Sequence, residues 1–373
     1  LDALLERQES LNFAPGTRFL YSNTGFRWLG QVVEQVAGET LASFLDRRIF
    51  QRLGMTSTRH TPDLLVPVEG LATGYMADGR RAAHAFPLGG EGGLVSSVED
   101  LALWARSLSV GTLGDGLEAM LEAPAPFAGG AINRYALGLE EDMWRGLRTV
   151  SHGGLWPGYK TAFLRVPAKR ITVIVIANNA ALDPHQMALQ VMEAALEGDG
   201  VLRLAPPPID VAPMAGRWVA EGLSLDIGAD GMARMHGVPF ALAAGEDGRL
   251  HARRGAFPFA ALPPQDGTMA VELDAGVSLP FRRAEGAPLP MLDGTWRCAE
   301  LGAEWLIAGD RVQPRGPLRR GPAWHMEAIA PGQLRVHMPA APFPAWADAV
   351  MDADGAAMTV HGGRARGLRF LRG

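Results

Sequence analysis

The first two hundred residues alternate between segments with helical spacing and segments typical of strands. Apolar residues recur at helical intervals after Tyr21-Ser22-Asn23, and Gly38 ends that pattern. A second helix is expected to begin after Thr40 and to end before Gly54. The periodic apolar positions are Phe26, Leu29, Val32, Val33 and Val36 in the first helix and Leu41, Phe44, Leu45 and Ile49 in the second.

A third helix is predicted after Ser97. Ser97 and Asp100 resemble a capping box, in which a serine and an acidic residue three positions later satisfy free amides at a helix start. Residues 159–166 and 171–177 have the composition of strands, and the second is a short β-branched run typical of a buried strand. Residues 187–196 predict a closing helix. This order predicts a mixed α and β domain.

The pattern changes in the glycine- and proline-rich stretch 198–214, which is incompatible with a helix or a central strand and predicts a linker. Beyond it the chain has short strands and turns, and it repeats. Gly216-Arg217-Trp218 returns as Gly294-Thr295-Trp296, and Gly248-Arg249-Leu250 returns as Gly332-Gln333-Leu334. We therefore predict two small antiparallel β-barrel domains.

The domain boundaries follow from these marks. We predict a mixed domain at 1–200, a linker at 201–213, a first barrel at 214–286 and a second barrel at 290–373. The second copy is the longer one, and its extra residues fall near Arg315, Arg319 and Arg320. Glycine and proline are frequent there, so we expect a protruding loop rather than a strand interior.

Composition excludes several classes of function. A hydrophobic fraction of 47% and a charged fraction of 20% allow a real core. The net charge of −5, without a basic stripe, argues against nucleic acid as a partner. The single cysteine, Cys298, excludes an intrachain disulfide, and the nine histidines lack metal-binding spacing, so we expect no metal and no cofactor. The longest mainly apolar run, Ile171–Ala177, is far shorter than the roughly 20 residues of a membrane helix, so we expect no membrane partner.

Three short motifs could carry chemistry, and each also has a purely structural interpretation. Tyr21-Ser22-Asn23 alone is a weak signal, because an aromatic residue beside a helix cap is common. Ser151-His152-Gly153-Gly154 could be a turn, yet a glycine pair on a strand lets another group approach the backbone. The glycine-rich segment Gly89–Ser97 could be an ordinary helix-entry loop. Taken together and in this order, the three motifs are more specific than any one alone.

These motifs resemble those of the penicillin-recognising serine hydrolases, which include class C β-lactamases, DD-carboxypeptidases, related esterases and D-aminopeptidases. The resemblance implies that Tyr21 and Asn23 form the second active-site motif. It also implies that His152 stands where other members carry the lysine of Lys-Thr-Gly. The matching segments are Phe13–Thr17, Tyr21–Asn23, Gly92–Ser97, Tyr135–Leu139 and His152–Gly154 with Pro157-Gly158-Tyr159.

Two barrel-like units behind such a domain make the chain similar to bacterial D-aminopeptidases. In that group a loop of the last domain reaches the catalytic cleft, so the resemblance implies this role for Arg315, Arg319 and Arg320. It implies a small peptide or amide substrate with an N-terminal D-amino acid or glycine. It also implies a substrate-binding strand at Gly153 and Gly154, with the amide of Leu155 as one oxyanion donor.

The resemblance fails at the nucleophile, which belongs to a Ser-x-x-Lys motif placed before Tyr-x-Asn. Lys160 and Lys169 are the only lysines, and proline and valine stand three positions before them. We interpret this as an N-terminal truncation rather than a loss by mutation. The hypothesis predicts that the chain alone is inactive. It also predicts exposed apolar surface near Tyr21 and residues 171–177.

The implied reaction is acyl transfer through a serine ester. Tyr21 would relay a proton to the leaving amine, Asn23 would hold the acyl amide, and His152 would hydrogen-bond Tyr21 and tune its proton affinity. A related esterase, a DD-peptidase or a non-catalytic binder of small ligands remain alternatives. The compartment, cytoplasmic or periplasmic, and the oligomeric state, with a homodimer as one alternative, stay open.

Overall fold

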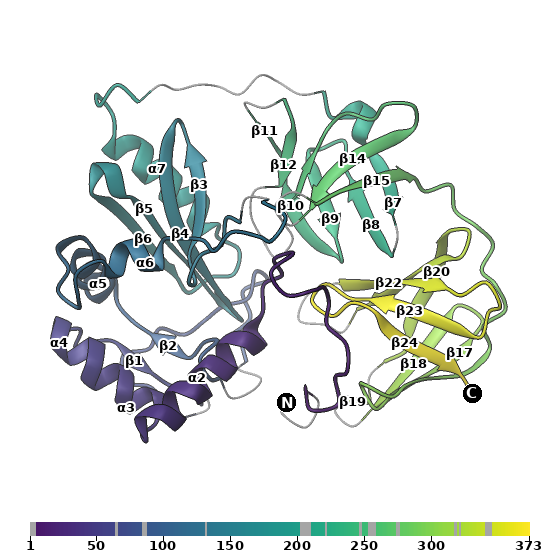
Figure 1. Cartoon of the computed structure of the whole chain (residues 1–373), viewed down its shortest axis with the longest axis horizontal. Coiled ribbons are helices and arrows are strands. Elements are labelled where there is room, and N and C mark those ends of the chain that lie inside the picture. The colour runs from purple at the N-terminus through teal and green to yellow at the C-terminus, as the bar shows by residue number, and fades with distance from the viewer. Residues whose placement is uncertain are drawn as a thin grey trace. The chain divides into compact units, whose positions relative to one another are not determined.

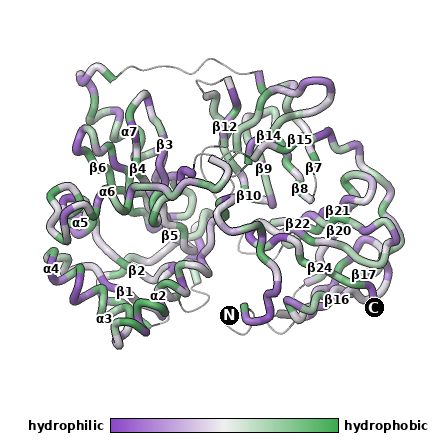
Figure 2. The backbone as a smooth tube through the Cα atoms, in the orientation of Figure 1, coloured by the Kyte–Doolittle hydropathy of each residue, from purple (hydrophilic) through white to green (hydrophobic). Residues whose placement is uncertain are grey.

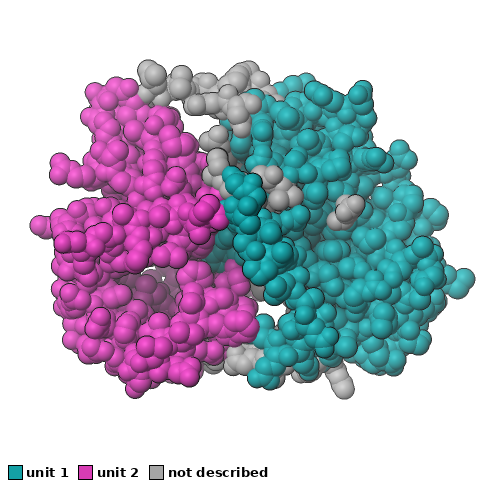
Figure 3. All heavy atoms as spheres, viewed as in Figure 1, with its two compact units in different colours: residues 1–21, 127–132, 205–373 teal, residues 22–126, 133–204 magenta. Residues whose placement is uncertain are grey.

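The computed structural model describes residues 5–63, 66–83, 88–130, 133–201, 210–220, 222–245, 248–252, 259–273, 277–316, 319–320, 322–339 and 345–373. The chain divides into two compact units (Figure 3). Unit 1 combines Leu1–Tyr21, Phe127–Ile132 and Ala205–Gly373, and unit 2 combines Ser22–Pro126 and Asn133–Leu204. Residues before Tyr21 therefore associate with the C-terminal part of the chain, while the boundaries at 1–200, 201–213, 214–286 and 290–373 stay predictions.

The first predicted helix of unit 2 is α2 (Asn23–Ala37). Its N-cap is Ser22, whose hydroxyl accepts a hydrogen bond from the Gly25 amide at 3.0 Å, so Asn23 is the first helical residue rather than the cap. Gly38 ends the helix with a φ of 68°, and its amide donates to Glu34. Hydrophobic and hydrophilic positions alternate along this helix (Figure 2).

The second predicted helix is built from three helical pieces. These are α3 (Leu41–Leu45), a π-helical turn (Asp46–Phe50) and α4 (Gln51–Leu53). As predicted, Thr40 caps the first piece by accepting from the Ser43 amide, and Gly54 follows the last one with a φ of 72°. The chain then forms β1 (Arg59–His60), which pairs with β2 (Leu94–Val95).

The third predicted helix is α5 (Val98–Val110), followed by α6 (Leu117–Leu121). Ser97 accepts from the Asp100 amide at 3.2 Å, as a cap should. The predicted capping box is nevertheless wrong in its acidic half. The Asp100 carboxylate accepts from the Ser57 amide and the Thr58 hydroxyl, each at 2.7 Å, and so joins α5 to the turn before β1.

A four-stranded antiparallel sheet forms the other half of unit 2 (Figure 1). Helix α7 (Pro184–Ala195) packs on β5 and β6 through a core that includes Leu164 and Met192. It begins earlier than predicted because Asp183 caps it by accepting from two backbone amides. The strands, in spatial order, are β3 (Glu140–Trp144), β4 (Leu147–Trp156), β5 (Tyr159–Val166) and β6 (Ile171–Ala177).

Apolar side chains are exposed at α2 and β6. Among the described strands, β6 pairs only with β5, so its outer edge lacks a strand partner there. Ile176 of β6 is 39% exposed. The exposed apolar residues of α2 are Trp28, Leu29, Val32 and Val36. Exposure in these places is what the truncation hypothesis expects, and the hypothesis itself stays a prediction.

Charged side chains join the sheet of unit 2 to its helices. Arg165 of β5, whose side chain is 2% exposed, donates to Glu122 at 2.5 Å and to Glu118 of α6. Arg148 of β4 donates to the other carboxylate oxygen of Glu122 and to Glu141, each at 2.9 Å. Because a buried charge is costly without partners, this network fixes α6 against the sheet.

Unit 1 contains two antiparallel barrels (Figure 1), which confirms the predicted fold class. Barrel 1 consists of β7 (Gly216–Ala220), β8 (Leu223–Ile227), β9 (Met232–Met235), β10 (Val238–Ala241), β11 (Ala243–Ala244), β12 (Leu250–Ala252), β13 (Phe259–Ala261), β14 (Thr268–Leu273) and β15 (Val277–Arg283). Barrel 2 consists of β16 (Gly294–Cys298), β17 (Ala303–Ala308), β18 (Arg311–Gly316), β19 (Arg319–Arg320), β20 (Trp324–Ala330), β21 (Gln333–Met338), β22 (Ala345–Met351), β23 (Ala357–His361) and β24 (Leu368–Arg372). Pairing of β17 with β18 closes barrel 2.

The repeated Gly-x-Trp motif has the same structure in both barrels. Trp218 and Trp296 are each 0% exposed, and each indole N–H donates to the carbonyl four residues earlier at 2.8 Å. Gly216 and Gly294 precede them with φ angles of 130° and 131°, which favour glycine. The repeat in the sequence therefore marks a buried tryptophan in the core of each barrel.

The segment expected to be a protruding loop is partly a β-hairpin. Arg315 lies in β18 and pairs with Arg320 of β19, and Gly316 pairs with Arg319. The expectation that glycine and proline exclude strand structure here is therefore wrong, because the hairpin continues the edge of barrel 2. The side chains of Arg319 and Arg320 lie outside the described residues, so their role stays a prediction.

A buried polar cluster, which we call the barrel junction, joins the two barrels. Ser224 of β8 donates through its hydroxyl to Asp348 of β22 at 2.5 Å and through its amide at 2.9 Å. The same hydroxyl accepts from Arg335 of β21 at 2.7 Å and from the Trp346 indole at 3.1 Å. Arg335 also donates twice to Asp226 of β8, at 2.8 and 2.9 Å. Each hydrogen-bonding direction of Ser224 is thus used across the junction.

Two titratable groups at the barrel junction have strongly shifted pKa values. Burial raises the pKa of Asp348 to about 7, although hydrogen bonds from Ser224 and the charge of Arg335 act in the opposite direction. Burial, with the charge of Arg366, lowers the pKa of His236 to about 3. Nδ1 of His236 lies 4.0 Å from Asp348. The folded junction therefore disfavours charge on both groups.

Separate substitutions of these two groups should change the pH dependence of stability in opposite directions. Asp348 contributes stability that is present below about pH 4 and lost as the pH rises toward its folded pKa of about 7. His236 contributes stability that is present above about pH 6.5 and lost as the pH falls toward about 3. In the intact chain the two slopes oppose each other between about pH 4 and pH 6.5.

Urea unfolding followed by tryptophan fluorescence measures both slopes. Compared with the unsubstituted chain, His236→Gln lacks the slope of His236, so its free energy of unfolding should decrease less, or increase more, as the pH falls from about 6.5 to about 4, by up to about 1.4 kcal/mol per pH unit. Asp348→Asn lacks the opposite slope, so its free energy of unfolding should decrease more steeply than that of the unsubstituted chain over the same range. Differences from the unsubstituted chain that have the same sign in both variants would contradict this account.

Candidate active site

The predicted His-Gly-Gly motif lies at a strand edge that is half open. Strand β3 pairs with β4 only as far as Ser151, whereas β5 continues to pair along the whole of residues 152–156. Within the described part of the chain, no strand covers the β3 side of His152–Trp156. Leu155 is 64% exposed there. This edge offers backbone amides and carbonyls that can pair with an extended ligand.

Gly154 is required by its neighbour across the sheet. It pairs with Thr161 of β5, and a Cβ atom on Gly154 would lie 2.5 Å from the Thr161 hydroxyl oxygen. A Cβ atom on Gly153 would meet the Thr161 carbonyl oxygen at a less severe 3.3 Å. Close packing against Thr161 therefore favours glycine at both positions. The same glycines also keep side chains away from the edge at which a ligand could bind.

His152 hydrogen-bonds to Tyr135, a residue to which the sequence motifs assigned no role. The Tyr135 hydroxyl lies 3.1 Å from Nε2 of His152, and the two rings meet edge to face with centroids 6.1 Å apart. Burial lowers the pKa of His152, and a hydrogen bond with Gly153 partly opposes that shift. His152 is therefore neutral at pH 7. The only sequence signal for Tyr135 was its place in the segment Tyr135–Leu139.

Tyr21 and Asn23 belong to different units, so each is described in its own surroundings. Tyr21 lies in unit 1, where its ring contacts the guanidinium of Arg364. Asn23 begins α2 in unit 2 and is exposed. The structure thus describes the surroundings of Tyr21, Asn23 and His152 separately, and their convergence stays a prediction.

The glycine-rich segment packs against α2. A Cβ atom on Gly90 would lie 2.2 Å from the Phe26 carbonyl oxygen, and one on Gly30 would lie 3.0 Å from the Gly90 backbone. Arg27 of α2 forms an ion pair with Glu91 at 3.2 Å. This contact sets the direction in which α2 leaves Asn23. The segment is thus a packing loop against the helix that begins at Asn23.

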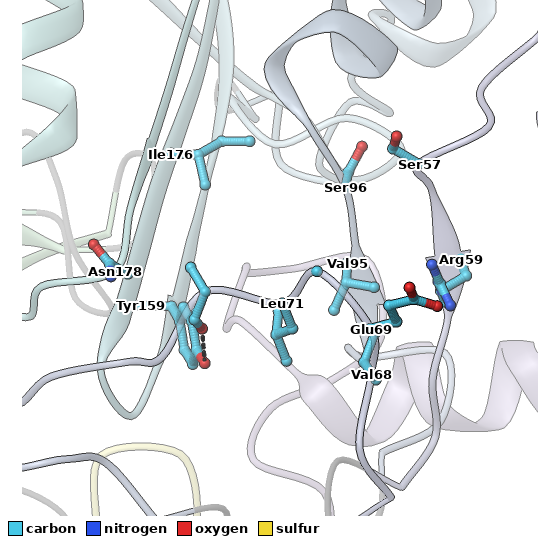
Figure 4. Close-up of a pocket in the computed structure, with 12 residues that line it drawn as sticks. Ser57, Arg59, Val68, Glu69, Leu71, Val95, Ser96, Tyr159, Ile176 and Asn178 are labelled. Atoms are coloured by element: carbon cyan, nitrogen blue, oxygen red, sulfur yellow. Dashed lines mark hydrogen bonds between the residues drawn. The ribbon is translucent and has the colours of Figure 1, made fainter.

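A cavity of about 280 Å³ lies elsewhere in unit 2. Figure 4 shows Ile176 of β6 on one side of it and Ser57 and Ser96 on the other. Near its floor the Tyr159 hydroxyl donates to the Ala72 carbonyl at 2.7 Å. None of Tyr21, Asn23 and His152 lines this cavity, so we do not assign the predicted chemistry to it.

No group of three or more His, Cys, Asp or Glu side chains in the described ranges of the chain could hold a metal ion. No helix in the same ranges is long and apolar enough to span a bilayer. Cys298 is buried, and burial raises the pKa of its thiol.

The chain is similar to a known protein family and to several known proteins. Residues 5–196 match the protein-family model described as Beta-lactamase. D-aminopeptidase from Brucella canis is 28% identical over 328 residues, which cover 82% of this chain and 60% of that protein. D-aminopeptidase from Brucella anthropi is 29% identical over 329 residues, with coverages of 83% and 60%. The chain thus spans 60% of the length of these curated relatives.

Among solved structures, the octameric penicillin-binding protein homologue from Pyrococcus abyssi is 16% identical to this chain. It covers 96% of this chain, which in turn covers 66% of it, with a TM-score of 0.45. At this score the likeness adds nothing to the argument from the sequence family.

The lowered pKa of His152 predicts that its imidazole titrates below the usual value of about 6.5. Histidine NMR signals recorded against pH, with His152→Asn to assign the signal, give the midpoint directly. A midpoint at or above the usual value would contradict the buried, neutral imidazole described here.

Gly154→Ala should destabilise unit 2 by about 1–3 kcal/mol, because the new methyl group meets the Thr161 hydroxyl. Gly153→Ala is a matched control with a milder contact and should cost less. Adding Thr161→Ala to Gly154→Ala removes the clashing oxygen and should recover part of the loss in urea unfolding. Equal costs for both alanines, or no recovery in the double variant, would refute the packing role.

Proposed function

Because the chain belongs to the Beta-lactamase family, we propose that it is part of a serine hydrolase that removes N-terminal D-amino acid or glycine residues from peptides or amides. The observation that carries the proposal is the extent of the similarity. The matches named D-aminopeptidase cover 82% of the chain and so continue beyond the family match at residue 196 into the barrels. The barrels are therefore part of the resemblance and not an unrelated addition.

The reaction that we propose is acyl transfer. A serine oxygen attacks the carbonyl carbon of the substrate amide, the C–N bond breaks, and water later hydrolyses the resulting ester. Tyr21 delivers a proton to the nitrogen of the leaving amine, and Asn23 donates its side-chain amide to the acyl group. The nucleophile and its lysine are supplied by a Ser-x-x-Lys segment that these 373 residues do not contain.

His152 suits a substrate that carries a free amino group. Burial keeps the imidazole neutral, and the bond to Tyr135 holds its ring in place. A lysine at this position would put a second positive charge near a substrate ammonium group and repel it. A neutral histidine avoids that repulsion.

The open edge of β4 suits a peptide or amide backbone. An extended substrate can pair with residues 153–155 as an added strand, because the pairing of β3 with β4 reaches only Ser151 of β4. Gly153 and Gly154 keep side chains out of that path, and the amide of Leu155 supplies one oxyanion donor. We also assign a cleft role to Arg315, Arg319 and Arg320, where a substrate carboxylate would suit guanidinium groups.

The test compares the 373-residue chain with a longer protein, made if the upstream coding DNA encodes Ser-x-x-Lys in frame. The 373-residue chain should neither hydrolyse a D-alanyl anilide nor be labelled by a serine-directed acylating probe. The longer protein should do both and prefer the D- over the L-alanyl substrate. In it, Tyr21→Phe should lower kcat by about 10²–10⁴-fold, the usual contribution of acid–base catalysis.

Tyr75→Phe in the longer protein is a matched control, since it removes a phenol hydroxyl to which we assign no role. Stoichiometric labelling of the 373-residue chain would overturn the assignment of the nucleophile. An ester-only substrate profile would replace the aminopeptidase by an esterase. Ligand binding without hydrolysis would favour a non-catalytic binding protein.

A further inference from the structure

A loop of barrel 2 places a positive charge on the ring of Tyr21. The loop Gly362–Gly367 joins β23 to β24, and the guanidinium carbon of Arg364 lies 4.6 Å from the centroid of the Tyr21 ring. Both residues belong to unit 1, so the contact is internal to that unit. A guanidinium within about 6 Å of an aromatic face is attracted to its π electrons.

The loop is held against the segment that leads to Tyr21. The Asn12 side chain donates to the Arg364 carbonyl at 3.2 Å and accepts from the Arg366 amide at 2.9 Å. Within the loop, the Gly362 amide donates to the Ala365 carbonyl at 2.7 Å. Two bonds from one amide side chain therefore fix the backbone on both sides of Ala365, and with it the position from which Arg364 reaches the ring.

In the described part of the chain, no carboxylate forms an ion pair with the Arg364 guanidinium, which lies against the Tyr21 ring. Burial lowers the pKa of the Arg364 guanidinium, and Tyr21 acts in the opposite direction. Among the described residues, its charge is therefore directed at the phenol.

Two histidines near this loop do not replace Arg364 as a cation. Burial lowers the pKa of His361 on β23 and of His236 in barrel 1, and the charge of Arg366 adds to both shifts. Both imidazoles are therefore neutral where a phenol titrates, at about pH 10. At the other end of the N-terminal segment, Gln8 donates to the Glu300 carbonyl and Arg7 to the Leu301 carbonyl.

We propose that Arg364 is a positioning residue for Tyr21: its guanidinium holds the phenol ring by its face, and its positive charge favours the phenolate over the phenol. The proposal rests on the proposed function for its catalytic meaning, since Tyr21 is the proton relay there. Loss of the Tyr21 proton to solvent or to a neighbouring base leaves an anion beside a fixed cation. A nearby cation stabilises the charged form of an acid.

Titration of tyrosine absorbance tests this contact without any enzyme assay. The chain has four tyrosines, and subtracting the curve of Tyr21→Phe from that of the 373-residue chain isolates Tyr21. Arg364→Met should move the Tyr21 midpoint upward by about 0.5–1 pH unit, a size set by a partly exposed cation beside an aromatic ring. Arg364→Lys keeps the charge and should restore most of that shift.

Arg369→Met is the matched control. Arg369 lies on β24 of the same hairpin but pairs with Asp352, so its loss should leave the Tyr21 midpoint unchanged. An unchanged midpoint in Arg364→Met, or an equal shift in Arg369→Met, would overturn the proposal. If Arg364→Met does not fold, Asn12→Ala keeps the charge while releasing the loop. It should then raise the midpoint by a smaller amount, and no rise would count against the proposal.

The proposal and the proposed function can fail separately. If Arg364→Met shifts the Tyr21 midpoint but the longer protein hydrolyses nothing, the role of Arg364 stands and the proposed hydrolase activity is rejected. If the longer protein is active, the limb of its kcat/KM profile that reports Tyr21 should move upward with Arg364→Met and return with Arg364→Lys. If the enzyme is active but Arg364→Met changes neither its kcat/KM profile nor the Tyr21 midpoint, the proposed hydrolase activity stands and the positioning role of Arg364 is rejected.

Discussion

The two-barrel unit depends on one buried exchange of hydrogen bonds, between Ser224 of barrel 1 and Asp348 and Arg335 of barrel 2. Each of these side chains is at most 1% exposed, so none can turn to water if its partner is lost. A buried charge without a partner costs several kcal/mol, whereas the assembled cluster satisfies it. Hydrogen bonds between buried polar groups therefore hold the two barrels together, in addition to apolar contacts. The residues before Tyr21 belong to the same compact unit as these barrels.

In unit 2, close approach of backbone segments orients the helix α2. Gly30 and Gly90 let α2 and the glycine-rich loop approach closely, and this fixes the direction of the helix that begins at Asn23. Strand β3 begins at Glu140, opposite Ser151, so among the described residues no strand covers that side of β4 beside His152. Neither feature depends on an unusual side chain. Both follow from where the backbone can approach and where a strand stops, which explains why short glycine-containing motifs mark this region of the sequence.

The sequence predicted the features that repeat locally. Helical spacing located α2 and α5, a β-branched run located β6, and the Gly-x-Trp repeat located a tryptophan that is buried in the core of each barrel. It did not predict the partners of Asp100, His152 or Asp348, because each is paired with a residue far away in the chain and no local pattern records such a pairing. The hairpin at Arg315 was missed for a related reason, since pairing with β17 outweighs the low strand preference of glycine and proline.

The buried tryptophan of the Gly-x-Trp motif is common to both barrels, but the side chains at the barrel junction differ. One barrel presents a hydroxyl and a carboxylate from β8, and the other presents a guanidinium, an indole and a carboxylate from β21 and β22. The two barrels thus have similar cores, but they present different side chains to each other at the barrel junction. A chimera with two copies of either barrel would keep every core residue of that module and still have no complementary surface at the seam.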